Sequence, residues 1–164
     1  MSIYNGTTVR TSDAHLSDLC REIHAGNVVA GWWTDRFTGE SILNTRNRAE
    51  LRMLIVSELS EASEGYAGAM MDDKLPSLPM FAVELADTAI RLFDLLGAEG
   101  EVVSAVYSRV PSAIWAMQPR ETDGRLMYIV NLVSGAMEHH RKGRLQDYGV
   151  KLMDALCAVI GLAE

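Results

Sequence analysis

Apolar side chains recur three and four residues apart along most of the chain, which is the spacing of one face of an α-helix. Segments with alternating apolar and polar residues, which would indicate half-buried strands, are sparse. The helical pattern predicts five segments, at residues 13–30, 48–72, 80–96, 125–142 and 146–162. The sequence therefore predicts an all-α bundle of about five helices, with residues 1–164 forming a single domain.

Glycine and proline residues separate the predicted helices. Pro76 and Pro79 turn the chain between the second and third helices, and this short connection makes the two helices antiparallel neighbours. Gly97 is expected to end the third helix. Residues 101–123 show the weakest pattern of secondary structure. This segment is consistent either with an insertion or with a lid over a site.

Glu58 lies within the apolar face of the second predicted helix. At 100° per residue its direction falls between those of Leu51 and Leu54. A carboxylate in that position is costly to bury unless it is paired or bound to a metal ion. Glu61 lies at the edge of the same face and Glu64 lies beyond it, so Glu58 is the most informative acid of the three.

The third predicted helix is apolar around most of its circumference. Its charged positions form a stripe about 80° wide, made of Glu84, Asp87, Arg91 and Asp94. This narrow stripe predicts a largely buried helix whose charged side faces a site. The alternative is that Asp87 and Arg91, four residues apart, form an ordinary ion pair on the surface.

The spacing of the acids indicates a metal site. Glu58 and Glu61 are three residues apart, as are Glu84 and Asp87, so each pair shares one face of its helix. Four converging carboxylates would repel by roughly 4 kcal/mol per pair at about 4 Å and an effective dielectric constant near 20. A hard divalent cation, Mg²⁺ or else Mn²⁺, would relieve this repulsion and leave room for a phosphate and a water molecule. Solvated helix faces are the alternative.

Two segments around these acids resemble a known metal-binding motif. Residues 56–64 read VSELSEASE and residues 83–87 read VELAD. Together they resemble the ExxE and ExxD helices of the all-α nucleoside triphosphate pyrophosphatases, the MazG-like and dimeric dUTPase superfamily. The similarity is clear over residues 48–97. Ser60 departs from the pattern, because the family often has glycine there, although a small residue is retained.

The resemblance implies Mg²⁺-dependent hydrolysis of a nucleoside triphosphate, in particular a deoxynucleotide, to the monophosphate and pyrophosphate. Glu58, Glu61, Glu84 and Asp87 would bind the metal, and Glu61 or Glu64 would accept the proton of the attacking water. It also implies a homodimer or homotetramer. Two alternatives remain open: a non-catalytic helical interaction or regulatory module, and a pyrophosphohydrolase of the phosphoribosyl-ATP type, which shares the metal pattern.

Residues 31–39 form an aromatic loop in a chain that is only 7% aromatic. Trp32 and Trp33 could stack on a nucleobase, or they could close the end of the bundle. Arg46 and Arg48, just after this loop, could reach phosphates, with a solvated start of the next helix as the alternative.

The polar face of the fourth predicted helix offers two further candidates for substrate binding. Asn131 could recognise a base edge and Lys142 could bind a phosphate. Solvent exposure is the alternative for both side chains.

Charge and cysteine content argue against several classes of binding partner. The formal net charge of −7 argues against general binding of nucleic acid or of an anionic membrane surface. Cys20 and Cys157 lie far apart without metal-binding spacing, which predicts buried, reduced thiols. Because no targeting signal and no apolar run of 18 residues are present, we expect a soluble cytoplasmic protein that does not bind membranes or nucleic acid.

Overall fold

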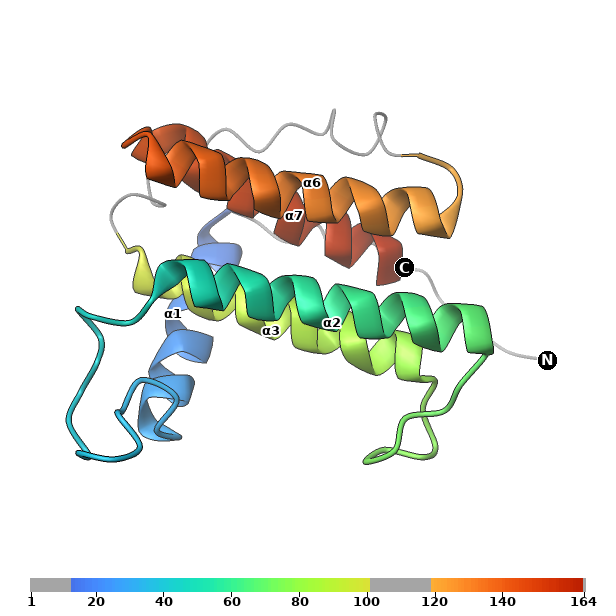
Figure 1. Ribbon diagram of the computed structural model, residues 1–164, viewed down its shortest axis with the longest axis horizontal. Coiled ribbons are helices and arrows are strands. Elements are labelled where there is room, and N and C mark those ends of the chain that lie inside the picture. The colour runs from blue at the N-terminus through green and yellow to red at the C-terminus, as the bar shows by residue number, and fades with distance from the viewer. Residues whose placement is uncertain (1–12, 101–118, 164) are drawn as a thin grey trace.

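The computed structural model describes residues 13–100 and 119–163. The described part is all-helical, which confirms the predicted fold class. Its helices are α1 (Asp13–Val29), α2 (Arg48–Gly68), α3 (Met80–Ala98), α6 (Thr122–Arg141) and α7 (Leu145–Ala163) (Figure 1). Most of the segment that sequence predicts as an insertion or lid, residues 101–118, lies outside the described residues.

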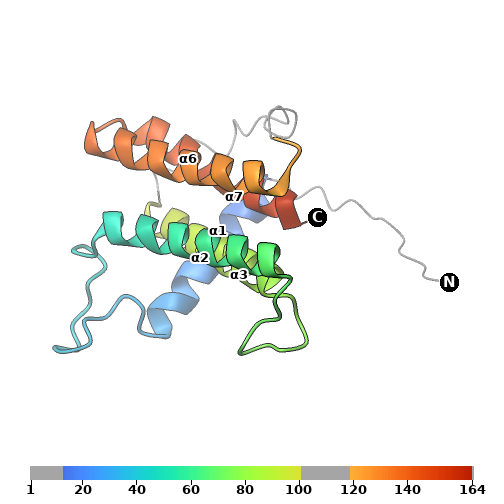
Figure 2. The same ribbon diagram turned by 45° about the vertical axis from the view of Figure 1, so that its right-hand side comes forward.

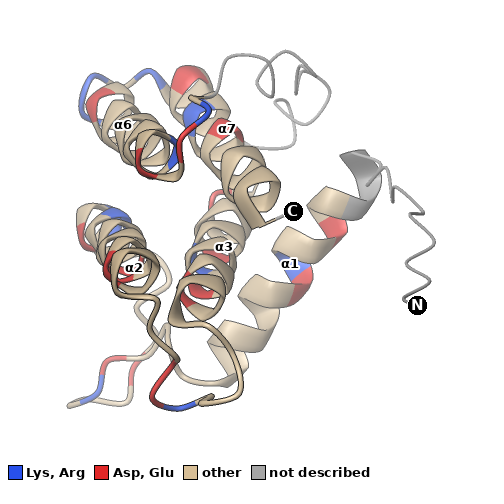
Figure 3. Cartoon of the chain, turned by 90° about the vertical axis from the view of Figure 1, so that its right-hand side faces the viewer, with Lys and Arg blue, Asp and Glu red and all other residues tan. Residues whose placement is uncertain are grey.

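Four of the helices run roughly alongside one another, in two layers. α2 packs on α3, α6 packs on α7, and the two layers meet through α3 with α7 and α2 with α6. Seen end-on, these helices occupy four corners, and α1 lies obliquely beside α3 (Figure 3). The turned view in Figure 2 shows the same separation of the α6–α7 layer from α2 and α3. No helix in the described ranges combines the length and apolar character needed to cross a bilayer.

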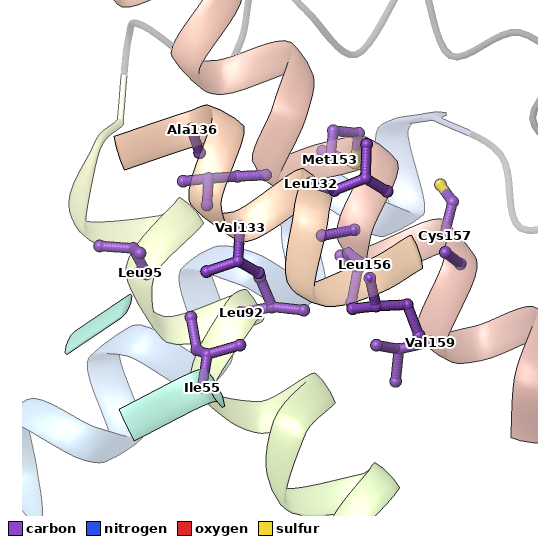
Figure 4. Close-up of a cluster of buried hydrophobic side chains, with 14 of the residues drawn as sticks. Ile55, Leu92, Leu95, Leu132, Val133, Ala136, Met153, Leu156, Cys157 and Val159 are labelled. Carbon is purple, nitrogen blue, oxygen red and sulfur yellow. The ribbon is translucent and has the colours of Figure 1, made fainter. Parts of the chain in front are cut away.

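The core lies between the two layers. Side chains from all four helices meet there, and each large apolar side chain that is fully buried stabilises the fold by about 1.5–3 kcal/mol. Figure 4 shows representatives from each helix: Ile55, Leu92, Leu132 and Leu156. Cys20 in α1 and Cys157 in α7 are both buried, as the sequence predicts.

α2 ends at Gly68, four residues before the predicted end at residue 72. Ala69 adopts the left-handed conformation, with φ 48° and ψ 42°, and this stops the helix. The backbone N–H of Met70 donates to the carbonyl oxygen of Gly65 at 3.0 Å, which satisfies one of the last helical acceptors. The periodicity of the apolar residues does not reveal this stop, because it depends on backbone conformation.

The connection between α2 and α3 is an ordered loop. Asp72 is buried, and its Oδ1 accepts from the backbone N–H groups of Lys74 at 3.0 Å and Leu75 at 2.6 Å. Met71 and Pro79 form an isolated antiparallel bridge at the base of the loop. The loop therefore fixes α2 and α3 as antiparallel neighbours, as the sequence predicts.

Gly97 lies inside α3 instead of ending it, so the predicted boundary at residue 96 is two residues early. A Cβ atom at this position would lie 2.3 Å from the carbonyl oxygen of Cys20 and 2.5 Å from the Cβ of His24. The glycine is thus required by the close approach of α1 to α3. This contact also brings the C-terminal end of α1 close to the charged side of α3.

Candidate metal centre and adjoining pocket

Three acids from α2 and α3 converge between these helices, two of them buried and the third more accessible. One carboxylate oxygen from each of Glu58, Glu84 and Asp87 lies within 4.8 Å of the other two. Glu58 and Glu84 are each only 7% exposed, and Asp87 is more accessible. We call these residues the acid trio. Three carboxylates at this separation, with one side open to solvent, are a donor set that could hold a metal ion.

The protonation state of the trio reflects its crowding. Burial, a hydrogen bond with Glu58 and the charges of Glu61, Glu58 and Asp87 raise the pKa of Glu84 to about 7. Burial and the charge of Glu58 also raise the pKa of Asp87, although Arg91 and Lys74 oppose the shift. Since nearby like charges disfavour ionisation, the trio holds a proton readily when no cation is bound. A hard cation would replace that proton and balance the same charges.

Arg91 provides the main counter-charge of the trio. Its Nη2 lies 2.5 Å and its Nε 2.6 Å from Oε1 of Glu58. The sequence left open an ion pair between Asp87 and Arg91 within one helix. The structure instead pairs Arg91 with Glu58 across the two helices, and this leaves Glu84 and Asp87 as the less compensated acids.

A cavity of about 170 Å³ adjoins the trio. Its polar wall includes Asp87, which is a member of the trio, and continues along the charged stripe of α3 to Arg91 and Asp94. Apolar side chains of α2 and α3, among them Leu54 and Ile90, form the remainder. Residues of α6 and α7 do not line this cavity, so it lies on the face of α2 and α3 that faces away from the second layer.

The two tryptophans of the aromatic loop have different environments. Trp32 is 52% exposed, lines the cavity, and lies with its ring centroid 5.9 Å from the guanidinium carbon of Arg91. Trp33 is 1% exposed, and its Nε1–H donates to Oδ1 of Asp94 at 3.0 Å. Arg48 lies over the Trp33 ring at 5.0 Å. Trp32 therefore has a surface for a ligand, whereas Trp33 contributes mainly to packing and forms part of the cavity wall.

Asp94 and His24 form a contact that no sequence motif indicates. The His24 Nδ1 lies 2.7 Å from Oδ1 of Asp94, and the His24 ring contacts the Trp33 ring edge-on at a centroid distance of 4.9 Å. Asp94 was visible as part of the charged stripe on the third helix. Its partners come from α1 and from the aromatic loop, and a local pattern does not indicate such distant contacts.

The remaining candidate residues are dispersed. Glu61 is exposed and close enough to raise the pKa of Glu84 through its charge. Glu64 is exposed one turn further along α2 and lies outside the trio. Asn131 and Lys142 are exposed on and just after α6, and neither lines the cavity; Lys142 Nζ pairs with Glu138 at 2.6 Å.

Arg46 connects the cavity to a larger open hollow beside the aromatic loop. The hollow shares Trp32, Arg46, Leu54 and Arg91 with the cavity. The Arg46 Nε is buried and has no hydrogen-bond partner among the described residues, and its Nη2 lies 3.7 Å from Oε1 of Glu50. Arg46 thus places positive charge at the mouth of the cavity, and the ion pair that it forms there, with Glu50, is long.

Comparisons with protein-family models, with curated proteins and with solved structures found no match to this chain. The side chains around the trio and the cavity are therefore the main basis for assigning a function. They combine clustered carboxylate oxygens, arginines and an accessible tryptophan within one continuous region of α2, α3 and the aromatic loop.

Proposed function

We propose that the protein is a Mg²⁺-dependent pyrophosphohydrolase that converts a nucleoside triphosphate, in particular a deoxynucleotide, to the monophosphate and pyrophosphate. The observation that carries the proposal is the position of the acid trio directly beside a cavity lined by Trp32. Asp87 belongs to both the trio and the cavity wall, and Arg91 of the cavity wall pairs with Glu58 of the trio. The resemblance of residues 48–97 to the all-α nucleoside triphosphate pyrophosphatases supports the same activity.

The donor set fits a magnesium ion. Glu58, Glu84 and Asp87 present carboxylate oxygens, the ligands that Mg²⁺ prefers. The raised pKa of Glu84 reflects its burial, its hydrogen bond with Glu58 and the negative charges of the neighbouring acids. We propose that these three residues hold the metal, with Glu61 as a neighbouring ligand. Mn²⁺ is the alternative cation. The bound metal would neutralise phosphate charge and increase the acidity of water.

The residues around the trio have separable roles in this proposal. Trp32 stacks on the nucleobase, since its ring is half exposed at the cavity. Arg46 and Arg91 contact the polyphosphate from the side of the open hollow that they line. Glu61 or Glu64 accepts the proton of the attacking water, and Glu61 is favoured because its charge raises the pKa of Glu84.

Phosphorus NMR tests the proposed reaction. The purified protein is incubated with each of dATP, dCTP, dGTP, dTTP and dUTP, with Mg²⁺ and separately with EDTA. Metal-dependent release of monophosphate and pyrophosphate is expected, and Asp87→Asn is expected to reduce the rate at least about 100-fold, since the substitution removes a metal ligand. Asp123→Asn, on the exposed first turn of α6, is the matched control and should retain the wild-type rate.

Other outcomes of this experiment are equally informative. No turnover of any triphosphate with Mg²⁺ or Mn²⁺ would contradict the proposal and favour the non-catalytic interaction module. Turnover of phosphoribosyl-ATP but of none of the five nucleotides would favour the related pyrophosphohydrolase.

We also propose a homodimer or homotetramer. The resemblance supports this, as does a group of exposed apolar side chains at the α2–α3 connection: Met70, Met71, Leu75 and Leu78. Light scattering after size-exclusion chromatography would give the assembly size. A monomeric mass at micromolar concentration would contradict the assembly without affecting the proposed reaction.

A further inference from the structure

The cavity beside the acid trio has the dimensions of a single ring. Its volume is about 170 Å³. An engineered apolar cavity of about 150 Å³ binds one benzene molecule, whereas pockets that enclose whole drug-sized ligands measure about 300–1,000 Å³. Leu51, Leu54 and Ile90 supply apolar walls, and Trp32 supplies an aromatic surface. One six-membered heterocycle fits this space and its chemistry.

One carboxylate among the cavity's polar groups is held in place. Asp94 is 8% exposed and lines the cavity. Its Oδ1 accepts from Trp33 Nε1–H at 3.0 Å and from His24 Nδ1 at 2.7 Å, whereas Oδ2 is contacted by the same Trp33 N–H at 3.2 Å. Among the described residues, His24 is the sole basic side chain in ion-pair contact with Asp94. Oδ1 anchors the group, and Oδ2 retains acceptor capacity.

A carboxylate oxygen accepts hydrogen bonds and repels other acceptors. Cytosine presents an exocyclic amino donor at C4, whereas uracil and thymine present a carbonyl acceptor there. Uracil could offer its N3–H to a carboxylate, but the carbonyl oxygens on either side of that group would then approach the second carboxylate oxygen. We therefore propose that Asp94 makes the cavity a cytosine-selective site, by accepting a hydrogen bond from the exocyclic amino group of the base.

Asn27 is placed to complete this recognition. It comes from the last turns of α1 and lines the same cavity as Asp94. Its side-chain amide can donate to N3 or O2 of cytosine, the two acceptors that the carboxylate cannot satisfy. The cavity therefore provides an acceptor for the amino group of the base, a donor for its ring acceptors, and Trp32 for its face.

The test measures binding of nucleoside monophosphates, so that it is independent of hydrolysis. Calorimetry or quenching of tryptophan fluorescence is recorded with dCMP and with dUMP. The wild-type protein is expected to bind dCMP at least about tenfold more tightly, the ratio that corresponds to about 1.4 kcal/mol of discrimination. Equal affinities, tighter binding of dUMP, or no binding of either compound would overturn the inference.

Asp94→Asn reverses the polarity at the position that contacts the base. Because Trp33 and His24 both donate to Asp94, the amide oxygen is expected to remain with them, and the amide nitrogen then takes the position of Oδ2. The variant should therefore prefer dUMP. Asp123→Asn is the control and should keep the preference for dCMP. An unchanged preference in a folded Asp94→Asn protein, as judged by circular dichroism, would overturn the role of Asp94.

This inference builds on the proposed function, because it assigns the base of the same nucleotide, and the two can fail separately. Turnover of all five triphosphates without a preference for dCTP over dUTP and dTTP would overturn the base assignment and leave the reaction intact. Selective binding of dCMP by a protein without pyrophosphohydrolase activity would overturn the reaction and leave the cytosine site intact.

Discussion

Arg91 on α3 and Glu58 on α2 form an ion pair across the two helices, with 2.5 Å between Nη2 and Oε1. In the described part of the chain no Lys or Arg forms an ion pair with Glu84 or Asp87, so Glu58 is the acid of the trio with the closest counter-charge. The three acids of the trio should consequently differ in their contribution to stability, although all three are proposed metal ligands.

Neutralising Glu84 should stabilise the metal-free protein at pH 8, whereas neutralising Glu58 should destabilise it. Glu84→Gln removes a carboxylate whose ionised form is disfavoured by burial and by the charges of its neighbours. Glu58→Gln removes the charged partner of Arg91 and breaks a mostly buried ion pair. We expect this to lower the free energy of unfolding by about 1–3 kcal/mol. Urea unfolding in EDTA would give both differences. From sequence alone, Glu58→Gln would be expected to leave the fold intact or more stable; equal stabilisation by the two variants would support that simpler expectation.

The free energy of unfolding of the metal-free protein should decrease as the pH rises from about 4.5 to about 7. The pKa of Glu84 rises from 4.5 to about 7 on folding, so the folded state binds this proton more tightly than the unfolded state. The stabilisation is complete below the unfolded pKa and is lost as the pH rises through the folded pKa. From about 1.4 kcal/mol per pKa unit, and allowing for solvent screening, we expect a decrease of roughly 1–3 kcal/mol.

Thermal unfolding in EDTA across this pH range would measure the decrease. In Glu84→Gln the melting temperature should depend less steeply on pH than in the wild type. Some dependence should remain, because Asp87 and Asp154 also have raised pKa values. A profile in Glu84→Gln identical to that of the wild type would show that Glu84 is not the titrating group.

The two adjacent tryptophans should give opposite phenotypes. Trp33→Ala should destabilise the fold by about 3–5 kcal/mol, because the ring is fully buried and its N–H binds Asp94. Trp32→Ala should leave the melting temperature within a few degrees of wild type and raise KM more than it lowers kcat, since it removes a stacking surface. Steady-state kinetics and calorimetry on the two variants would separate these roles. An unchanged KM in Trp32→Ala would exclude stacking on the base.

The approach of α1 to α3 should make Gly97 intolerant of a side chain. Gly97→Ala would place a Cβ 2.3 Å from the Cys20 carbonyl oxygen, which is backbone and cannot move alone. We expect a loss of about 1–3 kcal/mol from overpacking. Gly135→Ala in α6 is the matched control, because its Cβ would have no neighbour closer than 3.6 Å. The control should be neutral or stabilising by up to about 1 kcal/mol, from helix propensity alone.

The helices were predictable from sequence because they depend on local rules. Of the four acids that the sequence predicts to converge, Glu58, Glu84 and Asp87 come together, whereas Glu61 is exposed and outside this cluster. The helical period places Glu58 on an inward face, and the short connection makes α2 and α3 antiparallel. Together these bring Glu58 to Glu84 and Asp87 without further information.

The cavity was not predictable in the same way. Asp94 meets Trp33 across 61 positions of sequence and His24 across 70, so both contacts depend on how α1 and the aromatic loop pack on α3. The loop has little regular structure, with an isolated bridge between Thr34 and Ser41, and side-chain spacing within it carries no period. The sequence therefore could not decide, for either tryptophan, between stacking on a base and packing in the bundle. The difference in burial distinguishes the exposed Trp32 from the buried Trp33.

Arg91 touches both halves of the proposed site, since it pairs with Glu58 and lies beside the ring of Trp32. A cation bound to the trio would weaken the ion pair between Glu58 and the Arg91 guanidinium. A base stacked on Trp32 would compete with the same guanidinium for the indole ring. The affinities for metal and for nucleotide should therefore be thermodynamically linked, and each should change the other by the same factor. Titrating Mn²⁺ with and without dCMP would give that factor, and Arg91→Lys, which keeps the charge and loses the planar contact, should reduce it.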